Sequence, residues 1–123
     1  MTTNTLQTLG KRGEDLAARY LEQHGFTILA VNYRTPYGEL DLIAQKDALI
    51  LFVEVKTRRS AAYGMPEEAI TPRKKQHLLQ SAQHYLQTNP PSPETLMRID
   101  VIAIQLLPNQ LPQIKHFPNV ISE

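Results

Sequence analysis

The first part of the chain repeats its apolar residues at helical spacing. Ala17, Tyr20 and Leu21 recur at this spacing within residues 9–24, so we expect an amphipathic helix there. Gly25 follows directly, and glycine in that place is a common C-terminal cap. The pattern therefore predicts one helix that buries a single face.

Three segments rich in branched and aromatic residues come next and predict three strands. They are residues 26–33, 39–44 and 49–57. A turn is expected at 35–38, where proline and glycine occur, and a tight connection at 45–48 joins the second strand to the third. The third segment begins with apolar residues on both faces, which is typical of a strand covered on both sides.

A second helix and a last strand complete the predicted core. Thr71 and Pro72 provide an N-cap followed by proline at the first helical position. The helix should run to about residue 87 and bury Leu78, Leu79, Ala82, Tyr85 and Leu86. Residues 60–70 and 89–94 predict loops, 98–106 a strand and 113–117 a short edge strand. The order α-β-β-β-α-β predicts an α/β fold, a mixed sheet flanked by helices.

Length and composition fit one domain. The 123 residues allow a single hydrophobic core, which we place at about residues 8–106, with a proline-containing tail at 107–123. The absence of cysteine excludes disulfides, thiolate metal sites and a cysteine nucleophile. No segment resembles a signal peptide, and the longest apolar run, 48–53, is far below the ~20 residues that span a bilayer. We therefore expect a cytoplasmic protein without a membrane partner.

The net charge is only +1, from 13 Lys and Arg against 12 Asp and Glu. The sum alone argues against a nucleic-acid-binding protein, since such domains are usually plainly basic. The distribution is more informative, because basic residues gather at 11–12, 58–59 and 73–75 while several acids lie inside apolar segments. This separation is compatible with a basic face around an acidic pocket; solvated surface charge is the alternative.

The predicted third strand carries two charges after its apolar beginning. Glu54 and Lys56 are two residues apart and hence lie on the same face. A charge on a buried strand is costly unless it is paired or binds a metal. The strand therefore predicts either a local Glu–Lys pair where it emerges into water or part of a functional site.

The preceding strand places Asp41 among apolar residues. In an antiparallel hairpin, a two-residue turn at 47–48 pairs Asp41 with Glu54, whereas a turn one step earlier pairs it with Phe52. In both registers the two carboxylates converge on one side of the sheet. Carboxylates ~4 Å apart repel by roughly 4 kcal/mol at an effective dielectric constant of ~20. Mg²⁺, which prefers carboxylate and water oxygens, would relieve this repulsion.

Glu14 adds a third acid, on the helical face that also carries Ala17, Ala18 and Leu21. It could complete a metal shell, or it could stabilise the first turn of the helix through the helix dipole. The sequence leaves both roles open.

Several cations could contact phosphate groups. Arg73 and Lys74 open the second helix, whose N-terminal N–H groups also attract anions; surface charge that aids solubility is the alternative. Arg58 directly follows the Glu-x-Lys pair and is the better candidate, and Arg34 is expected near the same face.

The spacing of the acids resembles a known motif. Asp41, twelve further residues and then Glu54-Val55-Lys56 resemble the D-…-E-x-K pattern of restriction-endonuclease-like nucleases. Leu40 stands where a proline often precedes the aspartate. Longer blocks resemble the YraN family of bacterial proteins, which is similar in its core to archaeal Holliday-junction resolvases. These blocks, within residues 8–105, are 13–14, 32–34, 38–44, 52–58 and 68–72.

The resemblance implies a restriction-endonuclease-like αβββαβ core with a metal-dependent nuclease site. Asp41 and Glu54 would hold Mg²⁺ or Mn²⁺, Glu14 would complete the shell, and Lys56 would orient the attacking water and stabilise charge on the phosphate. We expect an endodeoxyribonuclease acting on DNA, with linear and branched DNA both open as substrates. The alternative is a nucleic-acid-binding module of the same fold with little or no activity. Junction resolvases act as dimers, so the analogy also suggests a homodimer.

Overall fold

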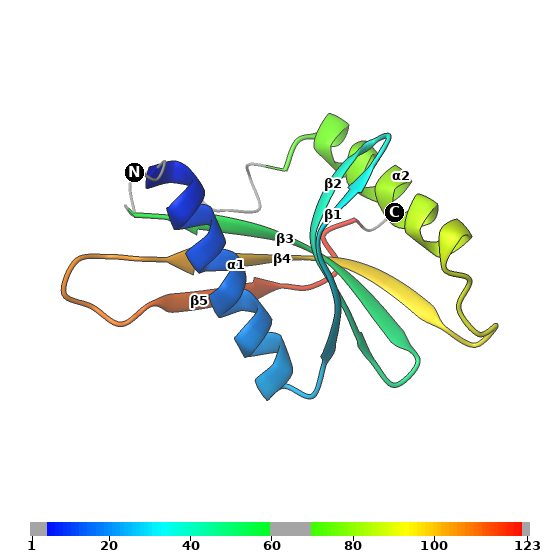
Figure 1. The fold of residues 1–123 in the computed structure, drawn as a ribbon, viewed down its shortest axis with the longest axis horizontal. Helices are drawn as coiled ribbons and strands as arrows, with labels where there is room; N and C mark the ends of the chain where they lie inside the picture. The colour runs from blue at the N-terminus through cyan, green and yellow to red at the C-terminus, as the bar shows by residue number, and fades with distance from the viewer. Residues whose placement is uncertain (1–4, 60–69, 122–123) are drawn as a thin grey trace.

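The computed structural model describes residues 5–59 and 70–121; apart from Ile70, the predicted loop at 60–70 lies outside them. The described residues form two helices and five strands, arranged as in Figure 1. In chain order these are α1 (Thr5–Gln23), β1 (Thr27–Thr35), β2 (Gly38–Lys46), β3 (Leu49–Arg58), α2 (Pro72–Thr88), β4 (Leu96–Gln105) and β5 (Gln113–Phe117).

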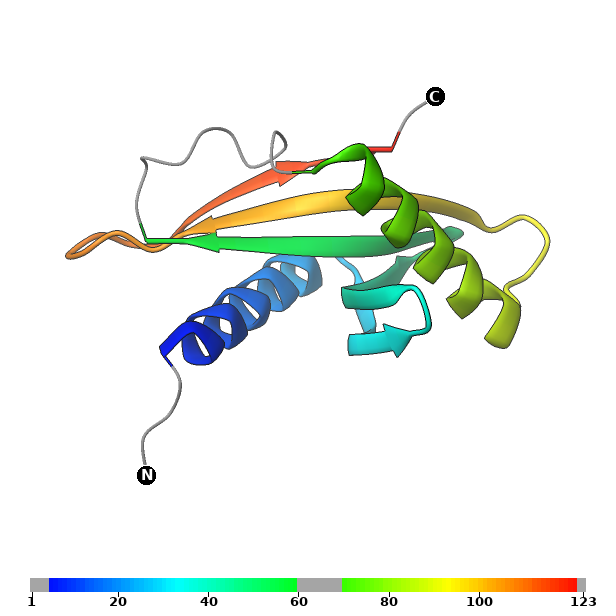
Figure 2. The same cartoon turned by 90° about the horizontal axis from the view of Figure 1, so that it is seen from above.

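The strands form one sheet in the order β1-β2-β3-β4-β5. All neighbouring strands are antiparallel except β3 and β4, which are parallel. Parallel neighbours need a crossover connection, and α2 lies on the path between them. Figure 2 shows α1 on one face of the sheet and α2 on the other. The predicted mixed α/β fold is thus confirmed, and it is consistent with a restriction-endonuclease-like core.

Each helix covers its own hydrophobic cluster. On the α1 side, Ala17 and Leu21 pack with buried residues of β2, β3 and β4. On the α2 side, Leu78 and Ala82 pack against the opposite faces of β2, β3 and β4. The other three α2 residues that were predicted to be buried are only partly covered; they are Leu79, Tyr85 and Leu86. No helix in the described ranges is long and apolar enough to cross a membrane.

The helix ends use the predicted caps. Gly25 has φ of +91° and donates its N–H to the Glu22 carbonyl at 3.0 Å, which ends α1. At α2, the Thr71 hydroxyl accepts a hydrogen bond from the Lys74 N–H at 3.1 Å. α1 begins at Thr5, earlier than the predicted residue 9; the prediction overlooked Leu6, which lies at helical spacing from Leu9.

The β2–β3 hairpin has the first of the two expected registers. Lys46 pairs with Leu49, so Asp47 and Ala48 form the two-residue turn. Asp47 has φ of +53°, a conformation that aspartate tolerates better than most residues. Continued along the strands, this register places Asp41 opposite Glu54.

The ladder between β2 and β3 stops before it reaches that position. Its last pair is Leu42 with Val53. Beyond it β2 stays paired with β1 alone, through Tyr33 with Leu40 and on to the turn. The turn end of the β1–β2 hairpin contacts α2, where Thr35 Oγ1 and Ser81 Oγ are 2.9 Å apart. Figure 1 shows this hairpin beside α2. The sheet therefore splits at Asp41.

Candidate active site

Asp41 lies at this split. Its Oδ2 accepts a hydrogen bond at 2.8 Å from the backbone N–H of Val55 in β3. The carboxylate thereby replaces a backbone acceptor that β2 no longer provides after it leaves β3. A side chain that completes the backbone hydrogen bonding in this way is held in one position. The split thus fixes the Asp41 carboxylate beside the end of β3.

The surroundings of Asp41 disfavour its charge. Burial is the largest cause and, together with the nearby negative charges of Glu54 and Glu14, raises the pKa of Asp41 to about 7. The hydrogen bond from Val55 and the charge of Lys74 act in the opposite direction. Asp41 is therefore an acid whose charge the fold does not stabilise, which is more common at functional sites than in structural ion pairs.

Glu54 is the buried centre of an ion-pair cluster. Its side chain is only 8% exposed, and its Oε1 lies 3.4 Å from Lys56 Nζ and 3.4 Å from Lys74 Nζ. The expected local Glu54–Lys56 pair is therefore present. It does not stand alone, because a second lysine from another element shares the same oxygen.

Lys74 makes an ion pair that the sequence did not indicate. The sequence suggested a phosphate contact at the start of α2, with surface charge as the alternative. In the structure, the first turn of α2 begins at the Thr71 cap and brings the Lys74 ammonium to 3.4 Å from Glu54 Oε1. Lys74 belongs to the carboxylate cluster, while the neighbouring Arg73 is exposed. The spacing of charges along a helix could not predict this pairing with a distant strand.

Glu14 reaches the cluster because α1 approaches β3 closely. Gly13 is buried, and a Cβ at this position would lie 1.8 Å from Thr57 Oγ1. Only glycine permits such an approach without displacement of the helix. The following residue, Glu14, has a raised pKa, chiefly because of partial burial; Glu39, Asp15 and Glu54 also raise it, whereas a hydrogen bond from Asn32 lowers it.

Asn32 links two of the acids and was not predicted as a site residue. With its amide nitrogen facing the carboxylates, it donates to Glu14 Oε2 at 3.1 Å and to Glu39 Oε1 at 3.0 Å. Its φ is +52°, a left-handed conformation in which asparagine is enriched among the non-glycine residues. Asn32 lies across from Asp41, between the pairs Val31–Leu42 and Tyr33–Leu40. The sequence offers only a weak signal for it, one asparagine within an otherwise strand-like segment.

The donor set fits a hydrated divalent cation better than an enclosed one. No group of three or more His, Asp or Glu side chains within residues 5–59 and 70–121 is close enough to surround a metal ion. The charge of Glu54 nevertheless raises the pKa of Asp41, because the two carboxylates lie near each other. Mg²⁺ commonly uses one or two carboxylates and completes its octahedron with water or phosphate oxygens. The pair Asp41–Glu54 suits that mode, with Glu14 held to one side by Asn32.

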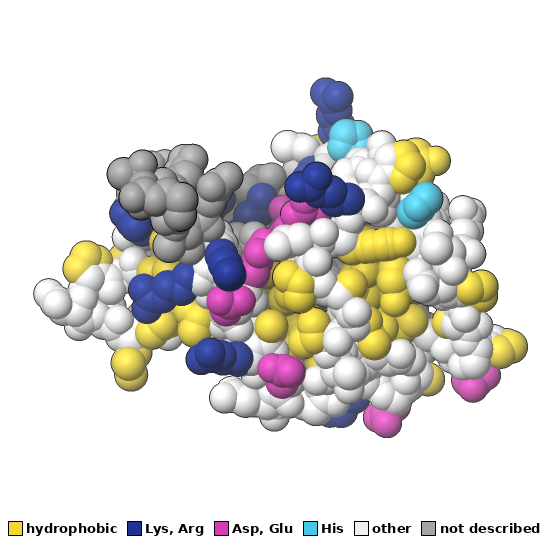
Figure 3. Space-filling view, in the orientation of Figure 1, with side chains coloured by type: hydrophobic (Ala, Val, Ile, Leu, Met, Phe, Trp, Pro, Cys, Tyr) yellow, Lys and Arg dark blue, Asp and Glu magenta, His cyan; other side chains and the backbone are white. Residues whose placement is uncertain are grey.

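The other expected phosphate contacts surround this cluster. Arg34 Nε lies 3.6 Å from Glu39 Oε2, and its side chain is 89% exposed. Arg58 lies at the end of β3, partly buried, and donates to the Thr57 carbonyl at 3.1 Å. Figure 3 shows basic and acidic side chains gathered in a band between α1 and the start of α2. Cations therefore lie next to an acidic centre, as the distribution of charge along the sequence suggested.

A second buried acid, Asp100 in β4, was not singled out in the sequence. Arg98 donates to both of its oxygens at 2.9 Å, and His116 Nε2 lies 2.6 Å from Oδ2. The Asn119 N–H also donates to Asp100, and the Tyr20 hydroxyl contacts His116 Nδ1 at 3.0 Å. Burial acts to raise the pKa of Asp100, but the hydrogen bonds from His116, Arg98 and Asn119 outweigh it and lower the pKa. Both oxygens of Asp100 have hydrogen-bond partners. We therefore read this network as a structural link between β4, β5 and α1.

Comparison with known proteins identifies the family. The model of the uncharacterised protein family UPF0102 matches residues 13–104. A UPF0102 protein of Syntrophomonas wolfei is 49% identical over 90% of this chain and 95% of its own. Similar proteins from Chloroherpeton thalassium and Geobacter sulfurreducens are 46% and 44% identical, over 84% and 90% of this chain and 79% and 86% of their own. The chain therefore belongs to UPF0102, the YraN family that its sequence blocks resemble.

Proposed function

We propose that this protein is a metal-dependent nuclease that cuts DNA internally. One observation carries the proposal: a partly buried aspartate, Asp41, is held next to a buried glutamate, Glu54, although the charge of Asp41 is disfavoured there. The two lysines beside Glu54 do not remove this penalty, since the pKa of Asp41 stays raised. A divalent cation that in turn binds a phosphate would stabilise the charged form of Asp41.

In this proposal Asp41 and Glu54 hold Mg²⁺ or Mn²⁺. The ion, when bound, would polarise the phosphate and lower the pKa of a water ligand. The split of the sheet contributes by keeping Asp41 in place through the Val55 N–H. Glu14 lies near enough to influence both acids electrostatically, and it would bind the ion through a water ligand or directly after leaving Asn32.

The two lysines would act on the substrate. Lys56, 3.4 Å from Glu54, is only 19% exposed, whereas Lys74 is 40% exposed. A desolvated ammonium beside the reacting phosphate stabilises the charge that develops in the transition state. Lys56 would therefore orient the attacking water and stabilise the phosphate. Lys74 would balance the charge of Glu54 before the substrate arrives and contact the phosphate afterwards.

Binding of the DNA backbone would fall to the exposed cations around the cluster. Arg58 ends β3, the strand that carries Glu54, and Arg73 lies in the first turn of α2, the helix that carries Lys74. Arg34 would contribute from β1. A homodimer would present two such sites, as a branched substrate with two equivalent strands requires. A nucleic-acid-binding module without activity remains the second candidate, because its phosphate contacts would be the same.

A cleavage assay distinguishes the two candidates. Purified protein would be incubated with four-way junction, flap, linear duplex and single-stranded DNA, and with RNA, in Mg²⁺, Mn²⁺ or EDTA. The nuclease proposal predicts cleavage of at least one DNA substrate that EDTA and Glu54→Gln both abolish. Binding without cleavage under every metal condition would favour the module.

A further inference from the structure

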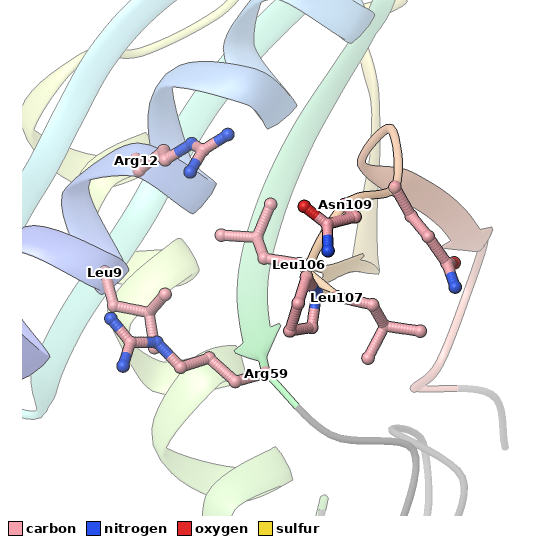
Figure 4. Close-up of a pocket in the computed structure, with 8 residues that line it drawn as sticks. Leu9, Arg12, Arg59, Leu106, Leu107 and Asn109 are labelled. Atoms are coloured by element: carbon pink, nitrogen blue, oxygen red, sulfur yellow. The ribbon is translucent and has the colours of Figure 1, made fainter.

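A pocket of about 410 Å³ opens beside the start of α1 (Figure 4). Leu9 and Arg12 of α1 and Arg59 after β3 line it from one side. The segment that follows β4 lines it from the other, through Leu106, Leu107, Pro108, Asn109 and Gln110. The pocket therefore has a mixed lining, with leucines and amide side chains on its walls and two arginines at its border.

The pocket and the candidate active site both lie near the place where Gly13 of α1 approaches Thr57 of β3. Arg12 precedes Gly13 directly, and Glu14 follows it, so the two side chains leave α1 on either side of this contact. On the strand side, Arg59 comes two residues after Thr57. A strand of nucleic acid that leaves the carboxylate cluster along the end of β3 would therefore reach this pocket next.

The lining selects a particular chemistry. Both ionic side chains that border the pocket are arginines, and no acid lines it. Guanidinium groups bind phosphate through two parallel hydrogen bonds and also stack on flat rings. The leucines on the opposite wall offer an apolar surface of the kind that buries a base or a sugar. Figure 4 shows Arg59 reaching toward Leu9, while Leu106 and Leu107 face them across the hollow.

We propose that this pocket holds one unpaired nucleotide of the nucleic-acid substrate. Arg12 and Arg59 bind its phosphate, and its base or sugar lies against the leucines. This inference rests on the proposed nuclease function and narrows its substrate to DNA with an unpaired segment next to the cleaved bond. A hollow of about 410 Å³ has room for a group the size of a nucleotide, and an unpaired nucleotide would enter it without the unstacking and unpairing energy that a base within a duplex would cost.

The test compares DNA of one sequence with and without a single-stranded overhang. Affinities are measured by fluorescence anisotropy at several salt concentrations, in the Asp41→Asn background so that the DNA stays intact. We expect tighter binding of the overhang substrate, and we expect Arg12→Ala/Arg59→Ala to remove that preference, about tenfold in affinity, with a salt slope smaller by about 1. Arg19→Ala, an exposed arginine on the same helix, is the matched control and should keep the preference.

Three outcomes overturn the inference. They are no preference for the overhang, a preference that survives in Arg12→Ala/Arg59→Ala, and an equal loss of affinity for both substrates in that variant. Cleavage of the overhang substrate by the wild-type protein, in Mg²⁺ or Mn²⁺ and abolished by Glu54→Gln, separates this failure from failure of the nuclease proposal. If the wild type cleaves but the overhang preference is absent or does not depend on the two arginines, only the inference about the pocket fails.

Discussion

The Asp41 carboxylate accepts a hydrogen bond from the Val55 N–H across 2.8 Å, just beyond the last residue pair that joins β2 to β3. This bond holds a partly buried acid beside Glu54, where its pKa rises to about 7. The arrangement is costly to the fold in the absence of a cation. Substitution of Asp41 should therefore change the free energy of unfolding as well as the activity.

Asp41→Asn should make the protein more stable at neutral pH. The folded state raises the pKa of Asp41 from 3.8 to about 7. The stabilisation therefore belongs to the protonated form: it is complete below pH 3.8 and is lost as the pH rises to about 7. Asparagine cannot ionise, and its carbonyl can still accept from Val55. Relative to the variant, the wild type should lose a few kcal/mol of unfolding free energy over this range, measured by urea denaturation without divalent ions. Parallel pH profiles of the two proteins would contradict the assigned environment.

Mg²⁺ or Mn²⁺ should reverse that order. An ion that binds only the folded protein adds about 2.7 kcal/mol at a hundred times its dissociation constant. The increase should appear in the melting temperature of the wild type and be absent in Asp41→Asn. Asp47→Asn is the matched control, since Asp47 is an exposed acid in the hairpin turn, and it should respond like the wild type. An equal response in all three proteins would indicate nonspecific ion binding.

Two glycines of α1 should respond in opposite ways to alanine. A Cβ at Gly13 would overlap Thr57 Oγ1, whereas one at Gly10 would have no heavy atom within 4 Å. Gly13→Ala should therefore cost about 1–3 kcal/mol through overpacking, and Gly10→Ala should gain up to ~1 kcal/mol of helix propensity. Thr57→Ala should recover much of the loss in the Gly13 variant. Denaturation midpoints measure all of these, and similar effects at both glycines would show that α1 does not approach β3 as described.

Asp100→Asn should be strongly destabilising. It breaks a buried ion pair with Arg98 and weakens the bond to His116, and removing one partner of such a pair typically costs 3–5 kcal/mol. The fold lowers the pKa of Asp100, so its stabilisation is present above pH 3.8, the ordinary value, and disappears as the pH falls through the lowered pKa. Asp15→Asn, an exposed acid on α1, should change stability by less than about 0.5 kcal/mol. A similarly small effect for Asp100→Asn would mean that the network is dispensable.

The elements followed from local patterns in the sequence. Apolar periodicity predicted both helices. As expected, α1 ends at Gly25 and α2 begins after its Thr71 cap. Branched and aromatic runs predicted the strands, including the short β5. The two-residue turn at Asp47 and Ala48 was one of two registers that the spacing allowed. These features depend on neighbours in the chain, which is why the sequence contains them.

The features that shape the site depend on distant residues. β2 separates from β3 at Asp41, across from the left-handed backbone conformation of Asn32 in β1. Beyond that point the β1–β2 hairpin contacts α2 through Thr35 and Ser81. The contact of Lys74 with Glu54 joins a helix to a strand across the core. No local pattern specifies either relationship. The sequence could therefore indicate Asp41, Glu54 and Lys56 as a group, but not what holds them.

The role of Lys56 is the most direct test of the proposed chemistry. The measurement is single-turnover cleavage of a DNA substrate at saturating protein, in Mg²⁺ or Mn²⁺, for the wild type and Lys56→Ala. Binding affinity is measured on the same substrate in Ca²⁺ or EDTA, with Arg73→Ala as the control that should lose affinity instead. We expect Lys56→Ala to bind DNA nearly as tightly as the wild type but to cleave it at least a hundredfold more slowly, because its charge matters most in the transition state. Cleavage by Lys56→Ala at the wild-type rate would show that Lys56 is only a structural partner of Glu54 and would contradict the mechanism.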